Sequence, residues 1–63
     1  MMTATDYWQM VYDHEKMCVD NLRAGSLSIN DVEGKSLIPG LIEKHERAAH
    51  EAQSVLLNLG TIM

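Results

Sequence analysis

Apolar residues recur at spacings of three and four between residues 6 and 24, which predicts a helix there. On a helix of 3.6 residues per turn, most of the large apolar side chains of this segment gather on one face. That face consists of Trp8, Val11, Tyr12, Glu15, Cys18, Val19 and Leu22, and Glu15 is the one charged residue in it. A face of this width is typical of a helix that packs against a neighbouring helix.

A second line of side chains follows the same segment and contains Tyr7, Met10, His14 and Met17. The rest of the circumference is polar. One neighbouring helix cannot cover both lines, so the second line needs either a core that wraps around it or a contact with another molecule. We expect an intermolecular contact, because a chain of 63 residues has few other segments to cover the line.

The same spacing returns between residues 37 and 59 and predicts a second helix. Its apolar face consists of Ile38, Leu41, Ile42, His45, Ala48, Ala49, Ala52, Val55, Leu56 and Leu59. Residues 25–36 are rich in glycine and serine and are expected to connect the helices. A helix start at Ser36 places Pro39 in the first turn, where proline is tolerated. The alternative is a start near Asn30, with a kink at Pro39.

The ends of the two helices also have candidate signals. Thr5 or Asp6 can cap the first helix, and Asp6 with Gln9 resembles a capping box. Gly25 and Gly60 stand where a glycine would end the first and second helix, respectively.

Each apolar face carries one polar residue near its centre, Glu15 in the first helix and His45 in the second. An antiparallel hairpin that brings these two together also places Trp8 opposite Ala52, so that a large side chain meets a small one. A hydrogen bond between Glu15 and His45 would define the register more than it would add net stability. The competing interpretation places one or both residues at the edge of the face.

The sequence therefore predicts an all-α fold, a single antiparallel helical hairpin that dimerises into a four-helix bundle. Below about 70–80 residues a lone core contributes little stability, so small domains use disulfides, metals or oligomerisation. Cys18 is the only cysteine, which excludes an intrachain disulfide. Self-association is the remaining route.

Charge and hydropathy restrict the possible partners. Nine acidic residues against five basic residues give a formal charge of −4, which argues against extensive contact with a phosphate backbone. The apolar runs are too short to span a bilayer. The first residues lack the basic and apolar regions of a signal peptide, so we expect a cytoplasmic protein.

No motif in the chain indicates catalysis. His45 and His50 are five residues apart, whereas a zinc-protease helix needs histidines four apart on one face. Glu46 and His50 could hold a metal only adventitiously, and a solvated polar face is the expectation for them. Cys18 lies on the core face, where a thiol is usually inert. We expect no catalytic residue, no metal site and no cofactor.

Aromatic side chains and methionines are enriched in protein interfaces, and methionine-lined surfaces adapt to different partners. The candidate partner-binding residues are therefore Tyr7, Trp8, Met10, Tyr12, His14 and Met17. The function we expect is a non-enzymatic module that docks on a partner or host regulatory protein and modulates or inhibits it. The alternative is a dimeric nucleic-acid-binding regulator of transcription or copy control.

At the level of architecture, the chain resembles two classes of small proteins. One is the plasmid copy-number hairpin that binds RNA and dimerises into a four-helix bundle, from which this chain departs in its acidic charge and long connection. The other is the class of phage-encoded helical-hairpin inhibitors, including the anti-quorum-sensing type. This second resemblance implies a host transcription regulator as partner and assigns no individual residue.

Overall fold

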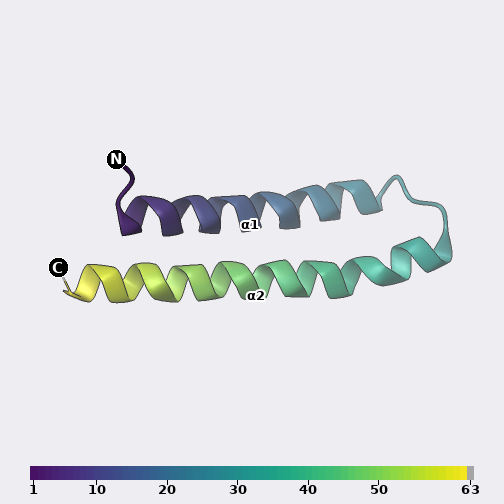
Figure 1. Ribbon diagram of the computed structural model, residues 1–63. Helices are drawn as coiled ribbons and strands as arrows, with labels where there is room; N and C mark the ends of the chain where they lie inside the picture. The colour runs from purple at the N-terminus through teal and green to yellow at the C-terminus, as the bar shows by residue number, and fades with distance from the viewer. Residues whose placement is uncertain (63) are drawn as a thin grey trace.

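The computed structural model describes the backbone of residues 1–62 and the side chains of residues 1–60, and it contains two long helices (Figure 1). Helix α1 spans Ala4–Ser26 and helix α2 spans Val32–Ile62. The helices lie side by side in opposite directions, so that both ends of the described chain lie at the same end of the molecule. This confirms the all-α antiparallel hairpin, and there is no strand within residues 1–62.

A capping box starts α1 two residues before the expected position. The backbone N–H of Asp6 donates to Thr3 Oγ1 over 3.0 Å, and the Thr3 N–H donates to Asp6 Oδ2 over 3.1 Å. The prediction that Thr5 or Asp6 is the cap was wrong. Thr3 satisfies one of the free N–H groups at the helix end, so Ala4 and Thr5 join the helix.

Helix α2 begins at Val32, several residues before the expected start near Ser36. Asp31 explains the difference, because its Oδ1 accepts the N–H of Glu33 over 3.2 Å and its carbonyl accepts the N–H of Lys35 over 2.9 Å. The predicted connection of residues 25–36 is therefore too long, and residues 27–31 connect the helices. The alternative with an early start and Pro39 inside the helix is the one observed.

Pro39 is the eighth residue of α2 and has no N–H to donate to the carbonyl of Lys35. In Figure 1, the first turns of α2 are bent relative to the rest of the helix. The two glycines expected to end the helices, Gly25 and Gly60, lie inside α1 and α2. Among the described residues no glycine has a positive φ, so neither helix ends in a left-handed glycine cap.

The seam between the helices follows a regular heptad pattern. Residues that are half-buried or buried recur at spacings of three and four along each helix. In α1 they are Trp8, Tyr12, Glu15, Val19, Leu22 and Ser26; in α2 they are Ile38, Ile42, His45, Ala49, Ala52, Leu56 and Leu59. The buried core is small and consists of Val19, Ile38, Ala49 and Ala52, each at most 7% exposed.

The hairpin is long and thin. Its extents are 48 × 20 × 12 Å and its radius of gyration is 14.8 Å, against about 11 Å for a compact domain of this length. Its accessible surface is 4941 Å², against about 4,100 Å² for a typical folded monomer of this mass. A single hairpin thus leaves more surface in water than a compact fold does.

We predict that Pro39→Ala stabilises the protein. The alanine supplies the missing N–H and removes the clash of the ring with the preceding turn, so the free energy of unfolding should rise by about 1–3 kcal/mol. Urea denaturation followed by far-ultraviolet circular dichroism measures the change.

The matched control is Gly40→Ala, because an added Cβ there meets no atom within 4 Å. This control should gain about 1 kcal/mol or less through helix propensity alone. A Pro39→Ala variant no more stable than the natural chain would show that the bend itself improves packing against α1.

Candidate functional site

The two polar residues of the seam meet at its centre. The Nδ1 atom of His45 lies 2.5 Å from Oε2 of Glu15, a short hydrogen bond between the two helices in a seam of mostly apolar side chains. The side chain of His45 is 31% exposed and that of Glu15 is 18% exposed. The contact expected from the sequence is therefore present, in a partly dehydrated position where an unpaired carboxylate would be costly.

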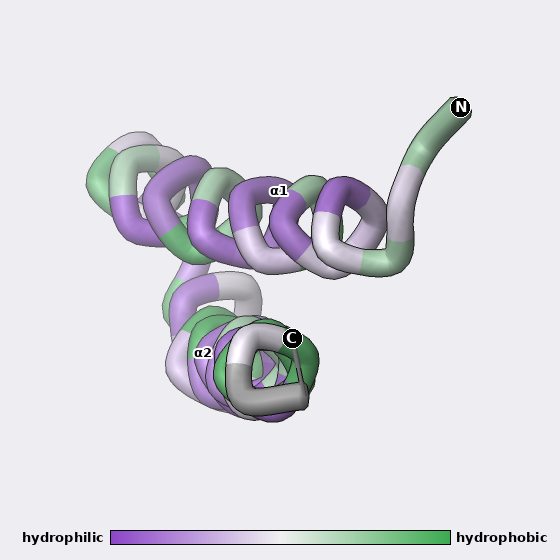
Figure 2. The backbone as a smooth tube through the Cα atoms, turned by 90° about the vertical axis from the view of Figure 1, so that its left-hand side faces the viewer, coloured by the Kyte–Doolittle hydropathy of each residue, from purple (hydrophilic) through white to green (hydrophobic). Residues whose placement is uncertain are grey.

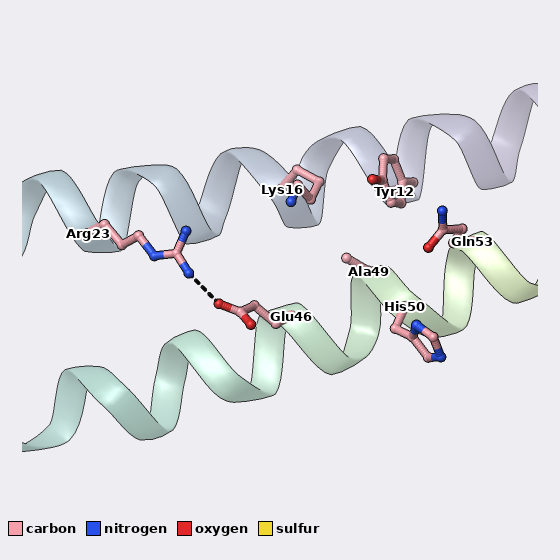
Figure 3. A pocket seen from close by; sticks show the side chains of 7 residues that line it. All are labelled: Tyr12, Lys16, Arg23, Glu46, Ala49, His50 and Gln53. Carbon is pink, nitrogen blue, oxygen red and sulfur yellow. Dashed lines mark hydrogen bonds and ion pairs between the residues drawn. The ribbon is translucent and has the colours of Figure 1, made fainter.

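One broad side of the hairpin is polar, and we call it the polar face. It is formed by Lys16 and Arg23 of α1 and by Glu46, His50 and Gln53 of α2, around an open hollow of about 260 Å³ (Figure 3). Arg23 Nη2 donates to Glu46 Oε1 over 2.6 Å across the hollow. Both side chains are about half exposed, so this ion pair adds little stability.

Both arginines of the hairpin are paired with neighbouring acids. Arg23 pairs with Glu46, and Arg47 pairs with Glu43 one turn earlier in α2 over 2.8 Å. A nucleic-acid interface needs several cations that are free to contact phosphates, and the polar face offers Lys16 beside a paired arginine, so this face is a poor candidate for one.

The opposite broad side is apolar, and we call it the apolar face. Cys18 lies about 160° round α1 from Lys16, and Ala48 lies about 160° round α2 from Glu46. Figure 2, which looks along α2, shows hydrophobic segments along its right-hand side. The apolar face is formed by Tyr7, Val11 and Cys18 of α1 and by Leu37, Leu41, Ala48 and Val55 of α2. Its aromatic and leucine side chains are exposed: Tyr7 47%, Leu37 68% and Leu41 43%.

A third surface lies on the outer side of α1 and contains the methionines. Met10 and Met17 point about 140–160° away from Glu15 and hence away from α2. They are 49% and 54% exposed and line a shallow, open hollow of about 500 Å³. The other lining residues are Asp6, Gln9, Asp13 and His14, so we call this surface the methionine–aspartate surface.

The six predicted partner-binding residues do not form one surface. Trp8 and Tyr12 are half-buried, and Tyr12 borders the polar face. Tyr7 belongs to the apolar face and packs edge-on against Trp8, with ring centroids 5.4 Å apart. Met10, His14 and Met17 share the methionine–aspartate surface.

The apolar face also contains residues outside the six predicted partner-binding residues, mainly Leu37, Leu41 and Val55 of α2. A signal for them exists in the sequence. Residues 37, 41, 44, 48, 51 and 55 repeat at spacings of four and three, which is a second heptad stripe beside the one used in the seam. Four of these six positions are apolar, and a second stripe indicates a second helical neighbour.

No arrangement in the described residues suggests a reaction. Cys18 Sγ lies 3.7 Å from His14 Nε2, a weak contact within one helix. His14 has no other hydrogen bond there that would orient its ring as in a catalytic triad. In the same part of the chain, no three His, Cys, Asp or Glu side chains are close enough to hold a metal ion.

Neither α1 nor the described part of α2 contains an apolar stretch that could cross a bilayer. Comparison of the chain with protein-family models, with curated proteins and with solved structures found no match. The three surfaces of the hairpin are therefore the features that bear on function.

The Glu15–His45 contact predicts how substitutions at the seam will behave. Glu15→Leu leaves His45 without its acceptor and should cost about 1–3 kcal/mol of unfolding free energy. The double variant Glu15→Leu, His45→Leu replaces both polar groups and should recover that loss or exceed the natural stability, because well-packed apolar pairs often outperform buried ion pairs. Urea denaturation of the natural chain and the two variants measures both effects.

The comparison variant is Arg23→Leu, which breaks the exposed pair with Glu46 and should cost less than about 1 kcal/mol. If Glu15→Leu, His45→Leu were no more stable than Glu15→Leu alone, the conclusion that Glu15 and His45 lie in a partly dehydrated seam would be wrong.

Proposed function

We propose that this chain is a non-enzymatic protein-binding module that acts as a homodimer of hairpins, a four-helix bundle. In this proposal the dimer docks on a partner or host regulatory protein and modulates or inhibits it. The observation that carries the proposal is that two separate surfaces of the hairpin expose large apolar side chains. One surface is available for a second copy, and the other is available for a foreign protein.

The small core supports the dimer. Four buried side chains, two of them alanines, provide little apolar burial for a chain of this length. The exposed leucine and tyrosine side chains on the apolar face are apolar surface that a second hairpin would bury. Leu37 and Leu41 lie one turn apart and are both exposed, and grouped exposed leucines are typical of an interaction surface.

The methionine–aspartate surface supports the foreign partner. Met10 and Met17 are flexible apolar contacts, and Asp6 and Asp13 flank them with negative charge. A partner helix that carries an apolar stripe between Lys or Arg residues would match both features. Such a partner differs in chemistry from this acidic chain, so the surface favours a foreign protein over a second copy.

A nucleic-acid-binding dimer, the alternative that the sequence left open, gains no support from the arrangement of charges. Arg23 and Arg47 are both paired with glutamates. A nucleic-acid complex would be recognised by an affinity that falls steeply with added salt.

We predict that the double variant Met10→Glu, Met17→Glu loses the foreign partner and remains a folded dimer. The two carboxylates would place charge in an apolar contact, and a central contact of this kind is usually worth more than about 2 kcal/mol, a roughly thirtyfold loss of affinity. The measurement is photo-crosslinking in cells from a benzophenone side chain at position 17. It is combined with sedimentation equilibrium of the purified double variant.

The matched control is Gln53→Glu, Ser54→Glu, which adds the same charge at exposed positions of α2 outside the apolar face. A benzophenone at position 54 provides the corresponding crosslinking control. Equal crosslinked products from positions 17 and 54, or none from position 17, would overturn the proposed binding surface.

A further inference from the structure

We infer that the apolar face is the dimer interface and that α2 packs against α2 of a second copy in antiparallel orientation, with the two-fold axis at Ala48. Lys44 of each copy then forms an ion pair with Glu51 of the other. This inference rests on the homodimer proposed above and specifies its geometry.

The exposed stripe of α2 is nearly self-complementary about Ala48. Leu41 and Val55 stand seven residues before and after it, and Lys44 and Glu51, of opposite charge, stand four before and three after. A two-fold interface uses the same patch twice, so each residue on one side of the axis needs a complementary residue at a similar distance on the other side. Rotation about Ala48 places Leu41 against Val55 of the second copy and brings the smallest side chain to the axis.

The charges on this stripe lack partners within the hairpin. The side chains of Lys44 and Glu51 are exposed and form no hydrogen bond or ion pair in the described part of the chain. They are seven residues apart on one helix, about 10.5 Å along its axis, so they cannot pair within one chain. The same rotation places each beside the opposite charge of the second copy.

The alternative two-fold arrangement, with its axis along the helices, packs α2 against α1 of the second copy. Lys44 would then meet the α1 side of the apolar face, which presents Tyr7, Val11 and Cys18 and no carboxylate. The acids of α1 at positions 6, 13 and 20 all point about 140–180° away from Glu15, outside this face. Charge complementarity therefore favours α2 against α2.

The dimensions of the hairpin are compatible with such an interface. Its two longer extents are 48 and 20 Å, and a standard stable interface buries about 800 Å² of accessible surface on each partner. A dimer of hairpins in this orientation would also double the thickness of the 12 Å layer and bury the side chains of Leu37 and Leu41.

The test is a charge exchange followed by sedimentation equilibrium over a dilution series. Lys44→Glu alone and Glu51→Lys alone each place two like charges against each other in the dimer, and each should raise the dissociation constant about tenfold or more. The double variant Lys44→Glu, Glu51→Lys restores opposite charges and should return to within about threefold of the natural value. An equimolar mixture of the two single variants should form heterodimers as tight as the natural dimer, because every contact then joins opposite charges.

A second measurement tests the position of the axis. In a Cys18→Ser background, Ala48→Cys should form an interchain disulfide on mild oxidation, since residue 48 meets its own copy only at the axis. Gln53→Cys, on the polar face, serves as the control and should not crosslink. Circular dichroism of each variant confirms that the hairpin is folded.

The outcomes of these experiments separate a failure of the proposed dimer from a failure of its proposed geometry. A natural chain that is a folded monomer at all concentrations overturns both the dimer and this geometry. A dimer in which the double exchange gives no recovery, or in which Ala48→Cys does not crosslink, overturns the geometry and leaves the proposed dimer in place. A dimer dissociated by Met10→Glu, Met17→Glu and unaffected by Lys44→Glu would place the interface on the methionine–aspartate surface.

Discussion

A seam between only two helices can cover only one stripe of each, and the rest of the structure follows from this limit. The seam buries Val19, Ile38, Ala49 and Ala52, while most other apolar side chains stay half-buried or exposed. Larger domains hide such residues by adding a third layer, which this chain lacks. The exposed leucines, methionines and tyrosine are therefore a direct result of the architecture, and they make association with another molecule the natural route to stability.

Within that seam, the contact of Glu15 with His45 restricts how the helices can slide past each other. Apolar heptads alone tolerate shifts by one heptad, because each shift again places apolar residues against apolar residues. A shift here would leave a carboxylate and an imidazole facing leucine or alanine without a hydrogen-bond partner. The polar pair therefore favours the observed register over a shifted one, and the register determines which residues lie opposite each other along the seam.

The two broad faces have opposite character although both helices contribute to each. Polar side chains around the Arg23–Glu46 ion pair cover the polar face, and the second heptad stripe of α2 forms much of the apolar face. The methionine–aspartate surface on the outer side of α1 is separate from both. The self-association surface and the partner surface that we propose therefore do not overlap on this chain of 63 residues.

Local sequence patterns predicted the helices, their apolar stripes and the contact between Glu15 and His45, because these depend on periodicity and on matching the single polar residue of each stripe. The helix ends were predicted less well. Asp31 and Thr3 cap the helices earlier than expected, and Pro39, Gly25 and Gly60 are tolerated inside them, since packing against the other helix offsets their poor propensity.

The sequence by itself thus determined the fold class and the excess of apolar surface, which follow from spacing and composition. Only the tertiary structure decided which side of α1 lies next to which side of α2, so that Lys16 and Arg23 border one hollow with Glu46. The direction of a stripe relative to a distant helix depends on how the two helices dock. The periodicity of one helix does not encode its rotation against another helix, because that rotation is a long-range choice.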